Sequence, residues 1–325
     1  MKRVIVLVAL LVVATAASLL IGDVNLGLGA LWQGVWGGDG PAALTIRVIR
    51  APRVAVALGA GAALGLSGAT LQTLLRNPLA APDIMGFTSG AGLAILVAIT
   101  VGLTLPLPLV SAAGGLVAAI LVVALAHRPG RATPAATVVL VGLGIGFTTT
   151  AIGTFLMTRL PSAGATEAQR WLTGSLAARD WGHACQIWGI GAVLALLLAL
   201  QVRGLGLLEL GNDLAAGLGL RVERTRWMLA ATAVALSAAG VAVAGPVPFV
   251  ALMAGPLGTR MTGAQRPGTR LTSAAAAGAG VMLLADLVAR AGIPGLQLPI
   301  GVMTGALGAP YLLWRLSREI ERGEL

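Results

Sequence analysis

The feature that most constrains this chain is a succession of apolar segments, each about long enough to cross a membrane. A helix that spans the hydrocarbon core of a bilayer needs about 20 predominantly apolar residues. Ten such segments are found, with approximate limits 4–22, 53–73, 86–104, 109–126, 135–157, 183–202, 227–245, 248–262, 271–289 and 298–316. The sequence therefore predicts an all-α polytopic membrane protein with about ten transmembrane helices.

The composition excludes an ordinary soluble domain. Of the 325 residues, 57% are hydrophobic and only 10% are charged, whereas soluble domains carry about 25% charged residues. The net charge of +10 comes from basic residues in short clusters between the apolar segments. Orientation in a membrane explains these clusters better than nucleic-acid binding does. We expect one transmembrane domain over residues 1–325, embedded in lipid and without a nucleic-acid partner.

The distribution of arginines predicts the topology. With the N-terminus in the cytoplasm, ten spans place fifteen Lys and Arg residues inside and seven outside, in agreement with the positive-inside rule. Both termini are therefore predicted to be cytoplasmic, in a protein of the cytoplasmic (inner) membrane. The seven outer arginines need another explanation; they are Arg47, Arg50, Arg53, Arg159, Arg170, Arg179 and Arg290.

Residues that commonly support catalysis or metal binding are scarce. Lys2 is the only lysine and no GxxxxGK[ST] sequence occurs, so the chain cannot bind ATP through a P-loop. Cys185 is the only cysteine, and His127 and His183 fall on opposite predicted sides of the membrane. We therefore expect no metal site and no enzyme activity, whether as an ATPase or on a lipid substrate.

Asp286 is an acidic residue inside an apolar segment. A carboxylate in a span often marks a proton or ion site, which would suit an ion-coupled secondary transporter. However, such transporters usually place several ionisable groups within their spans. Arg290 follows at the i+4 position, so an ion pair at the end of a helix is the simpler interpretation.

The loop at about 203–226 has an amphipathic pattern too short to span a membrane. Leu210, Leu214 and Leu218 recur every four residues, with Glu209 and Asp213 on the polar side and a glycine at position 219 as a helix stop. Such a helix could lie flat on the lipid surface or dock into a partner protein. The pattern alone favours neither.

Small and hydroxylated residues suggest close helix packing and a polar path. The glycine and alanine spacing over residues 59–68 allows neighbouring helices to approach closely. Three consecutive threonines, Thr148, Thr149 and Thr150, could line a weakly polar translocation path, although packing between helices is the favoured interpretation.

Six sequence blocks resemble one known family. They are RAPRVAVALGAGAALGLSGATLQTLLRNPLAAPDIMGFTSGAG, WLTGSLAARDW, LGNDLAAGLGLRV, GPVPFVALMAGPLGTR, ADLVAR and LPIGVMTGALGAPYLLWRL. Together they resemble the FecCD-type permeases, the membrane subunits of binding-protein-dependent ABC importers for iron–siderophore complexes, haem and cobalamin. The segment NPLAAPDIMGFTSGAG is most similar in sequence to permeases for ferric catecholate siderophores.

This resemblance implies the type II ABC importer permease fold and a transport cycle of ATP-driven alternating access. Two permease subunits, as a homodimer or a heterodimer, would work with two ABC ATPase subunits and a periplasmic or lipid-anchored solute-binding protein. ATP would bind the ATPases, and the permease would hold no cofactor of its own. The expected cargo is an iron–siderophore complex, with haem or cobalamin as the alternative.

The resemblance also assigns roles to residues of this chain. Arg50, Arg53 and Arg290 match the arginines that dock the binding protein. A coupling helix that contacts the ATPase is implied for Asn212, Asp213, Leu214, Ala215, Leu218 and Gly219. A motif at the cytoplasmic end of the second span matches Gln72, Arg76, Asn77 and Pro78.

Overall fold

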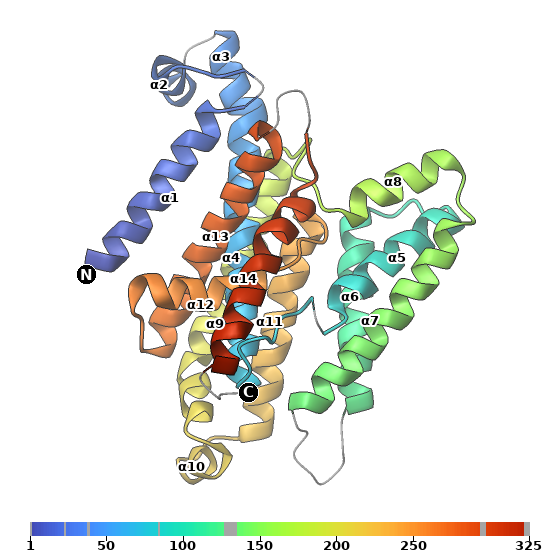
Figure 1. Ribbon diagram of the computed structural model, residues 1–325, viewed down its shortest axis with the longest axis vertical. Coiled ribbons are helices and arrows are strands. Elements are labelled where there is room, and N and C mark those ends of the chain that lie inside the picture. Colours follow the sequence, from blue (N-terminus) through green and yellow to red (C-terminus); the bar gives the residue numbers. More distant parts are fainter. Residues whose placement is uncertain are drawn as a thin grey trace.

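The computed structural model describes residues 2–22, 24–37, 40–83, 85–126, 135–292 and 297–321, and in these ranges all regular structure is helical. His127, and the basic residues Arg128, Arg131 and Arg322 of the predicted inner set, lie outside them. Figure 1 shows an elongated bundle with α10 (Asn212–Gly217) at one end. The other end holds α2 (Leu28–Trp36), α3 (Pro41–Leu44) and α8 (Ser162–Leu172). Helix α1 (Lys2–Leu20) rises toward α2 and α3.

Each of the ten predicted spans corresponds to a helix. They are α1 (Lys2–Leu20), α4 (Ala51–Leu74), α5 (Phe87–Val101), α6 (Leu107–Ala126), α7 (Ala135–Met157), α9 (Trp181–Glu209), α11 (Val222–Ala244), α12 (Val250–Thr262), α13 (Pro267–Ala291) and α14 (Ile300–Glu321). Within the described ranges, seven helical stretches are long and apolar enough to cross a membrane. Helices α5 and α12, with 15 and 13 residues, are shorter.

Several short helices join these ten. They are α2 (Leu28–Trp36), α3 (Pro41–Leu44), the π-helix η1 (Thr45–Arg50), α8 (Ser162–Leu172) and α10 (Asn212–Gly217). The helix of the predicted span 53–73 begins earlier than the hydropathy indicates, because α3 and η1 extend α4 into a continuous helical stretch, Pro41–Leu74. Proline at the start of α3 suits this extension because the first turn of a helix needs no N–H donor there.

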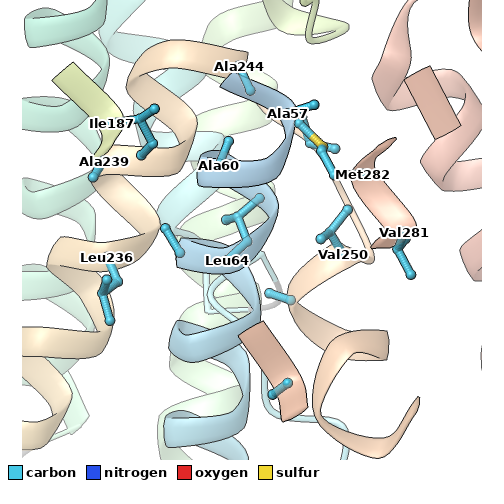
Figure 2. Close-up of a cluster of buried hydrophobic side chains, with 14 of the residues drawn as sticks. Ala57, Ala60, Leu64, Ile187, Leu236, Ala239, Ala244, Val250, Val281 and Met282 are labelled. Atoms are coloured by element: carbon cyan, nitrogen blue, oxygen red, sulfur yellow. The ribbon is translucent and has the colours of Figure 1, made fainter. Parts of the chain in front are cut away.

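Helix α4 is the centre of the bundle and packs against α9, α11, α12 and α13. Fifteen of its 24 residues are buried, most of them Ala, Gly, Val and Leu. Figure 2 shows Ala57, Ala60 and Leu64 of α4 among side chains of the neighbouring helices. The small residues let the backbones nearly touch: a Cβ atom added at Gly65 would lie 2.3 Å from the carbonyl oxygen of Ala274 on α13. The predicted close packing of residues 59–68 is therefore confirmed.

Helices α5, α6 and α7 form a second group beside this centre, with α8 across their upper end in Figure 1. Helix α7 packs on α5 and α6 through one face only. Its other face exposes large apolar side chains, among them Leu140, Phe147 and Phe155. This surface suits either lipid or another protein chain.

Candidate functional site

The end of the bundle near α2 and α3, which is predicted to face outward, contains a buried cluster of charges around Asp286. This carboxylate has no solvent exposure and lies 2.8 Å from Nη2 of Arg53 and 3.3 Å from Nε of Arg290. Nε of Arg53 also donates to it at 2.9 Å. The predicted ion pair with Arg290 is thus present, and Arg53 is a second partner that spacing along the sequence could not show. Two guanidinium partners make Asp286 a counter-charge within the structure.

Arg50 and Arg290 hold the end of α1. Arg50 donates to the carbonyl oxygen of Leu20 at 2.7 Å, and Arg290 donates to that of Ile21 at 2.8 Å and to Oγ of Ser18 at 2.7 Å. The last carbonyl groups of a helix have no partner within the helix, and cations are favoured beside them. Arg50 and Arg290 therefore satisfy the C-terminal end of α1 and fix it to α4 and α13.

The predicted docking role requires arginine side chains that a binding protein can reach. Arg50 and Arg290 are each only 7% exposed, whereas the side chain of Arg53 is 17% exposed. Arg53 and Arg290 share the carboxylate of Asp286. Docking of a binding protein remains a prediction, and in this conformation Arg53 offers the most accessible of the three guanidinium groups.

A second group of polar residues lies at the start of α9. Asp180 caps this helix, because its Oδ1 accepts hydrogen bonds from the backbone N–H of His183 at 3.0 Å and from Nδ1 of His183 at 2.7 Å. The backbone hydrogen bond lowers the pKa of Asp180, with the side-chain hydrogen bond as the next cause. Burial lowers the pKa of the neighbouring Arg179. His183 is thus part of a helix cap.

At the opposite end, the motif formed by Gln72, Arg76, Asn77 and Pro78 organises the turn after α4. The side-chain amide of Gln72 donates to the carbonyl oxygens of Pro78 and Leu252, both at 2.9 Å. Oδ1 of Asn77 accepts from the backbone N–H of Leu79 at 2.8 Å, which closes the turn. The motif therefore fixes the chain reversal and attaches it to α12.

The same motif reaches the end of α9. Arg76, which has a positive φ of 49°, donates through Nη2 to the carbonyl oxygen of Leu208 at 2.8 Å. Arg270 of α13 donates to Oγ1 of Thr73 at 2.9 Å and forms an ion pair with Glu209. The ends of α4 and α9 and the start of α13 are thus connected just before α10 begins.

Helix α10 presents an apolar surface. Leu210, Leu214 and Leu218 are 56%, 63% and 63% exposed, while Ala215 is buried. A short helix in this loop and a stop at Gly219, whose φ is +84°, are confirmed. Nη2 of Arg226 donates to Oδ1 of Asn212 at 3.0 Å and connects α10 to α11. Asp213 is exposed beside these leucines.

The threonine run lies on α7. Thr148 and Thr150 are exposed, and Thr149 is half-buried. The hydroxyl groups of Thr148 and Thr149 donate to the carbonyl oxygens of Gly144 and Ile145, each at 2.8 Å. Packing within this chain therefore does not account for the two exposed threonines, and a role in a translocation path remains a prediction.

The contacts of Asp83 are a further feature that the sequence pattern did not predict. Asp83, in the loop between α4 and α5, accepts from the backbone N–H of Phe249 at 3.1 Å and from Oγ1 of Thr88 at 3.2 Å. Phe249 has a positive φ of 67° at the start of α12. Asp83 thereby joins the beginnings of α5 and α12. The acidic residue after Pro82 was the available signal, but its partner lies 166 residues away.

Comparison with known proteins decides the family. The sequence profile of the FecCD transport family matches residues 10–318. The chain belongs to the FecCD transport family. The ferric enterobactin transport system permease protein FepG of Escherichia coli (strain K12) is 40% identical, over 97% of this chain and 95% of that protein.

A second relative and a solved structure support the same family. The Fe(3+)-citrate import system permease protein YfmE of Bacillus subtilis (strain 168) is 33% identical, over 98% of this chain and 96% of that protein. A solved structure of an inward-facing metal-chelate type ABC transporter superposes with a TM-score of 0.82 at 28% identity, over 97% of this chain and 98% of that chain. This FecCD family member is therefore a multi-pass membrane permease, not an enzyme. No group of three or more potential metal ligands occurs in the part of the chain that the structure describes.

Proposed function

We propose that this protein is the permease subunit of a binding-protein-dependent ABC importer that moves an iron–siderophore complex into the cell by ATP-driven alternating access. The observation that carries the proposal is the 40% identity to a ferric enterobactin permease over nearly the full length of both chains. A catecholate siderophore is the favoured ligand, and haem or cobalamin is the alternative. ATP acts through a partner ATPase, because this chain lacks a P-loop.

The contacts at the α10 end support a route by which the ATPase could drive the permease. The exposed Leu210, Leu214 and Leu218 form an apolar surface for a groove on the ATPase. Movement of α10 would act on the end of α9, which Arg76 and Arg270 connect to α4 and α13. The closely packed α4 and α13 would then move together as a rigid body.

The outer end supports contact with an acidic binding protein. The guanidinium groups of Arg50, Arg53 and Arg290 would attract carboxylates, because a guanidinium can bind a carboxylate through two parallel hydrogen bonds. Because Arg50 and Arg290 also hold α1, the docking role should be tested at Arg53. We expect Arg53→Gln to weaken binding-protein docking several-fold while ATPase assembly is kept, and unchanged docking would contradict the role.

A second permease subunit is the proposed partner of the exposed face of α7. This face carries Phe147 and Phe155 beside Thr148 and Thr150. In a dimer with α7 near the interface, these threonines would lie close to a central path. Cysteine pairs at Thr148 of two copies should then crosslink in membranes, whereas cysteine at the exposed Leu200 of α9 provides a matched control.

Transport by proteoliposomes tests the function as a whole. The permease is reconstituted with its ATPase and binding protein, and uptake of a ferric catecholate is compared with uptake of cobalamin and haem. We expect ATP-dependent uptake of the ferric catecholate that persists when a protonophore collapses the proton gradient. Uptake driven by a proton or sodium gradient without ATP would instead identify a secondary transporter, the rival suggested by Asp286.

A further inference from the structure

A cavity of about 470 Å³ lies at the α10 end of the bundle, among the ends of α4, α9, α12, α13 and α14. One part of its lining is apolar and comes from residues such as Leu205, Leu271 and Pro256. The other part is polar and includes three arginines from three separate elements. These are Arg76 after α4, Arg270 of α13 and Arg315 of α14.

Two of these guanidinium groups keep hydrogen-bond donors for a ligand. The hydrogen bonds of Arg76 to Leu208 and Glu209, and those of Arg270 to Thr73 and Glu209, all use Nη2. A guanidinium has five N–H donors on three nitrogens. Among the residues that the structure describes, Nε and Nη1 of Arg76 and Arg270 therefore have no protein acceptor. Both side chains can also be reached by solvent.

Acidic side chains are scarce around Arg76 and Arg270. Among the residues that the structure describes, no acidic residue lines the cavity. Glu209 pairs with Arg270 from the edge and supplies one negative charge. Membrane orientation explains why arginines gather at this end of the bundle, but it does not explain why three of them line one cavity. Their convergence favours a ligand with negative charge.

We infer that this cavity is a binding site for a phosphate-bearing anion. Tetrahedral phosphate oxygens suit several converging guanidinium groups, which bind them by charge-assisted hydrogen bonds. The side chains of Asn77 and Thr259 add polar groups to the same wall. The volume falls within the usual range for small-molecule sites, so it admits a phosphate together with an attached organic group. Two sources share this chemistry: an anionic phospholipid headgroup and a soluble phosphate compound.

Binding at this position would act on the coupling region. The anion would join Arg76, Arg270 and Arg315, and hence the ends of three elements, beside the Arg76–Leu208 and Arg270–Glu209 contacts that precede α10. The occupied site would stabilise these elements against separation. The inference concerns binding to the permease itself and does not depend on which substrate is transported.

Thermal unfolding of the full-length protein in nanodiscs tests the site in two arms. In the first, the discs contain only zwitterionic phosphatidylcholine and inorganic phosphate is titrated. In the second, phosphate is omitted and phosphatidylglycerol replaces part of the phosphatidylcholine. We expect a rise in the unfolding temperature in at least one arm. A rise with phosphate identifies a soluble anion as a ligand, and a rise with phosphatidylglycerol alone identifies a lipid headgroup.

Variants establish whether the effect comes from this cavity. Arg270→Gln together with Arg315→Gln should weaken the apparent affinity at least about tenfold, because each charge-assisted hydrogen bond contributes that much. Arg270→Lys, which keeps the charge, should retain most of the binding. Arg266→Gln removes an exposed arginine one turn away that does not line the cavity, and it serves as the control.

Two results would overturn the inference. One is no stabilisation by either phosphate or phosphatidylglycerol. The other is an equal response of the double variant and of Arg266→Gln, which would show general attraction of anions to a basic surface. Native mass spectrometry of the wild-type protein and the double variant gives an independent readout, because a bound phosphate or phospholipid adds a defined mass.

Discussion

The close contact of α4 with α13 predicts a large effect from the addition of one methyl group. In Gly65→Ala, the new Cβ would lie 2.3 Å from the carbonyl oxygen of Ala274, whereas ordinary contacts begin at 3.4 Å. The two helices would therefore have to separate by about 1 Å at this point. Gly278 of α13 meets the carbonyl oxygen of Gly61 in the same way, so the contact cannot be relieved by moving one flexible side chain.

The expected cost follows from known overpacking energies. Extra atoms in a well-packed core destabilise a protein by about 1–3 kcal/mol. Alanine is also a better helix former than glycine by about 1 kcal/mol, so a glycine in open space should show no loss when replaced. Gly191 of α9 has no atom within 4 Å of an added Cβ and provides this control.

Thermal unfolding in nanodiscs, followed by tryptophan fluorescence, measures the effect. We expect the unfolding temperature of Gly65→Ala to fall by roughly 2–10 °C, while Gly191→Ala stays at or above the wild-type value. If both variants unfold at the wild-type temperature, the glycine contact does not hold α4 and α13 together. Loss of transport by Gly65→Ala without a change in unfolding temperature would show that the contact serves movement instead.

Three further predictions follow from the two ends of the bundle. Asp286→Asn removes the buried carboxylate charge that Arg53 and Arg290 share, and it should destabilise the protein by about 3–5 kcal/mol, seen as a lower unfolding temperature. Leu214→Asp with Leu218→Asp should abolish co-purification of the ATPase without changing that temperature, since both leucines are 63% exposed; normal co-purification would refute the coupling role. Asp180→Ala should lower the unfolding temperature at pH 7. The pKa of Asp180 is lowered in the folded protein. The stability that its carboxylate contributes is therefore fully present above the ordinary aspartate pKa and is lost as the pH falls through the lowered pKa. The difference between wild type and variant should therefore shrink at acid pH, and a constant difference would contradict the capping role.

Part of the predicted coupling region was readable from local sequence. The four-residue spacing of Leu210, Leu214 and Leu218 predicted a short amphipathic helix, and Gly219 predicted its stop. Both follow from the geometry of a single helix turn. The assignment of a docking role needed the resemblance to a family, because exposed leucines have the same pattern whether they meet lipid or protein.

The arginines near Asp286 illustrate what local spacing does not reveal. Spacing correctly predicted the pairing of Asp286 with Arg290, since residues four apart share a helix face. It could not predict the contact of Asp286 with Arg53, which is 233 residues distant in sequence. Nor could it show that Arg50 and Arg290 bind the carbonyl groups at the end of α1.

The sequence by itself determined where the chain crosses the membrane, because about 20 apolar residues in lipid must satisfy their own backbone hydrogen bonds and therefore form a helix. Tertiary structure alone decided which side chains meet. The cavity of Arg76, Arg270 and Arg315 and the link from Asp83 to Phe249 arise only when α4 packs against its neighbours. These contacts depend on the rotation and depth of each helix, which close packing of small residues fixes and hydropathy does not.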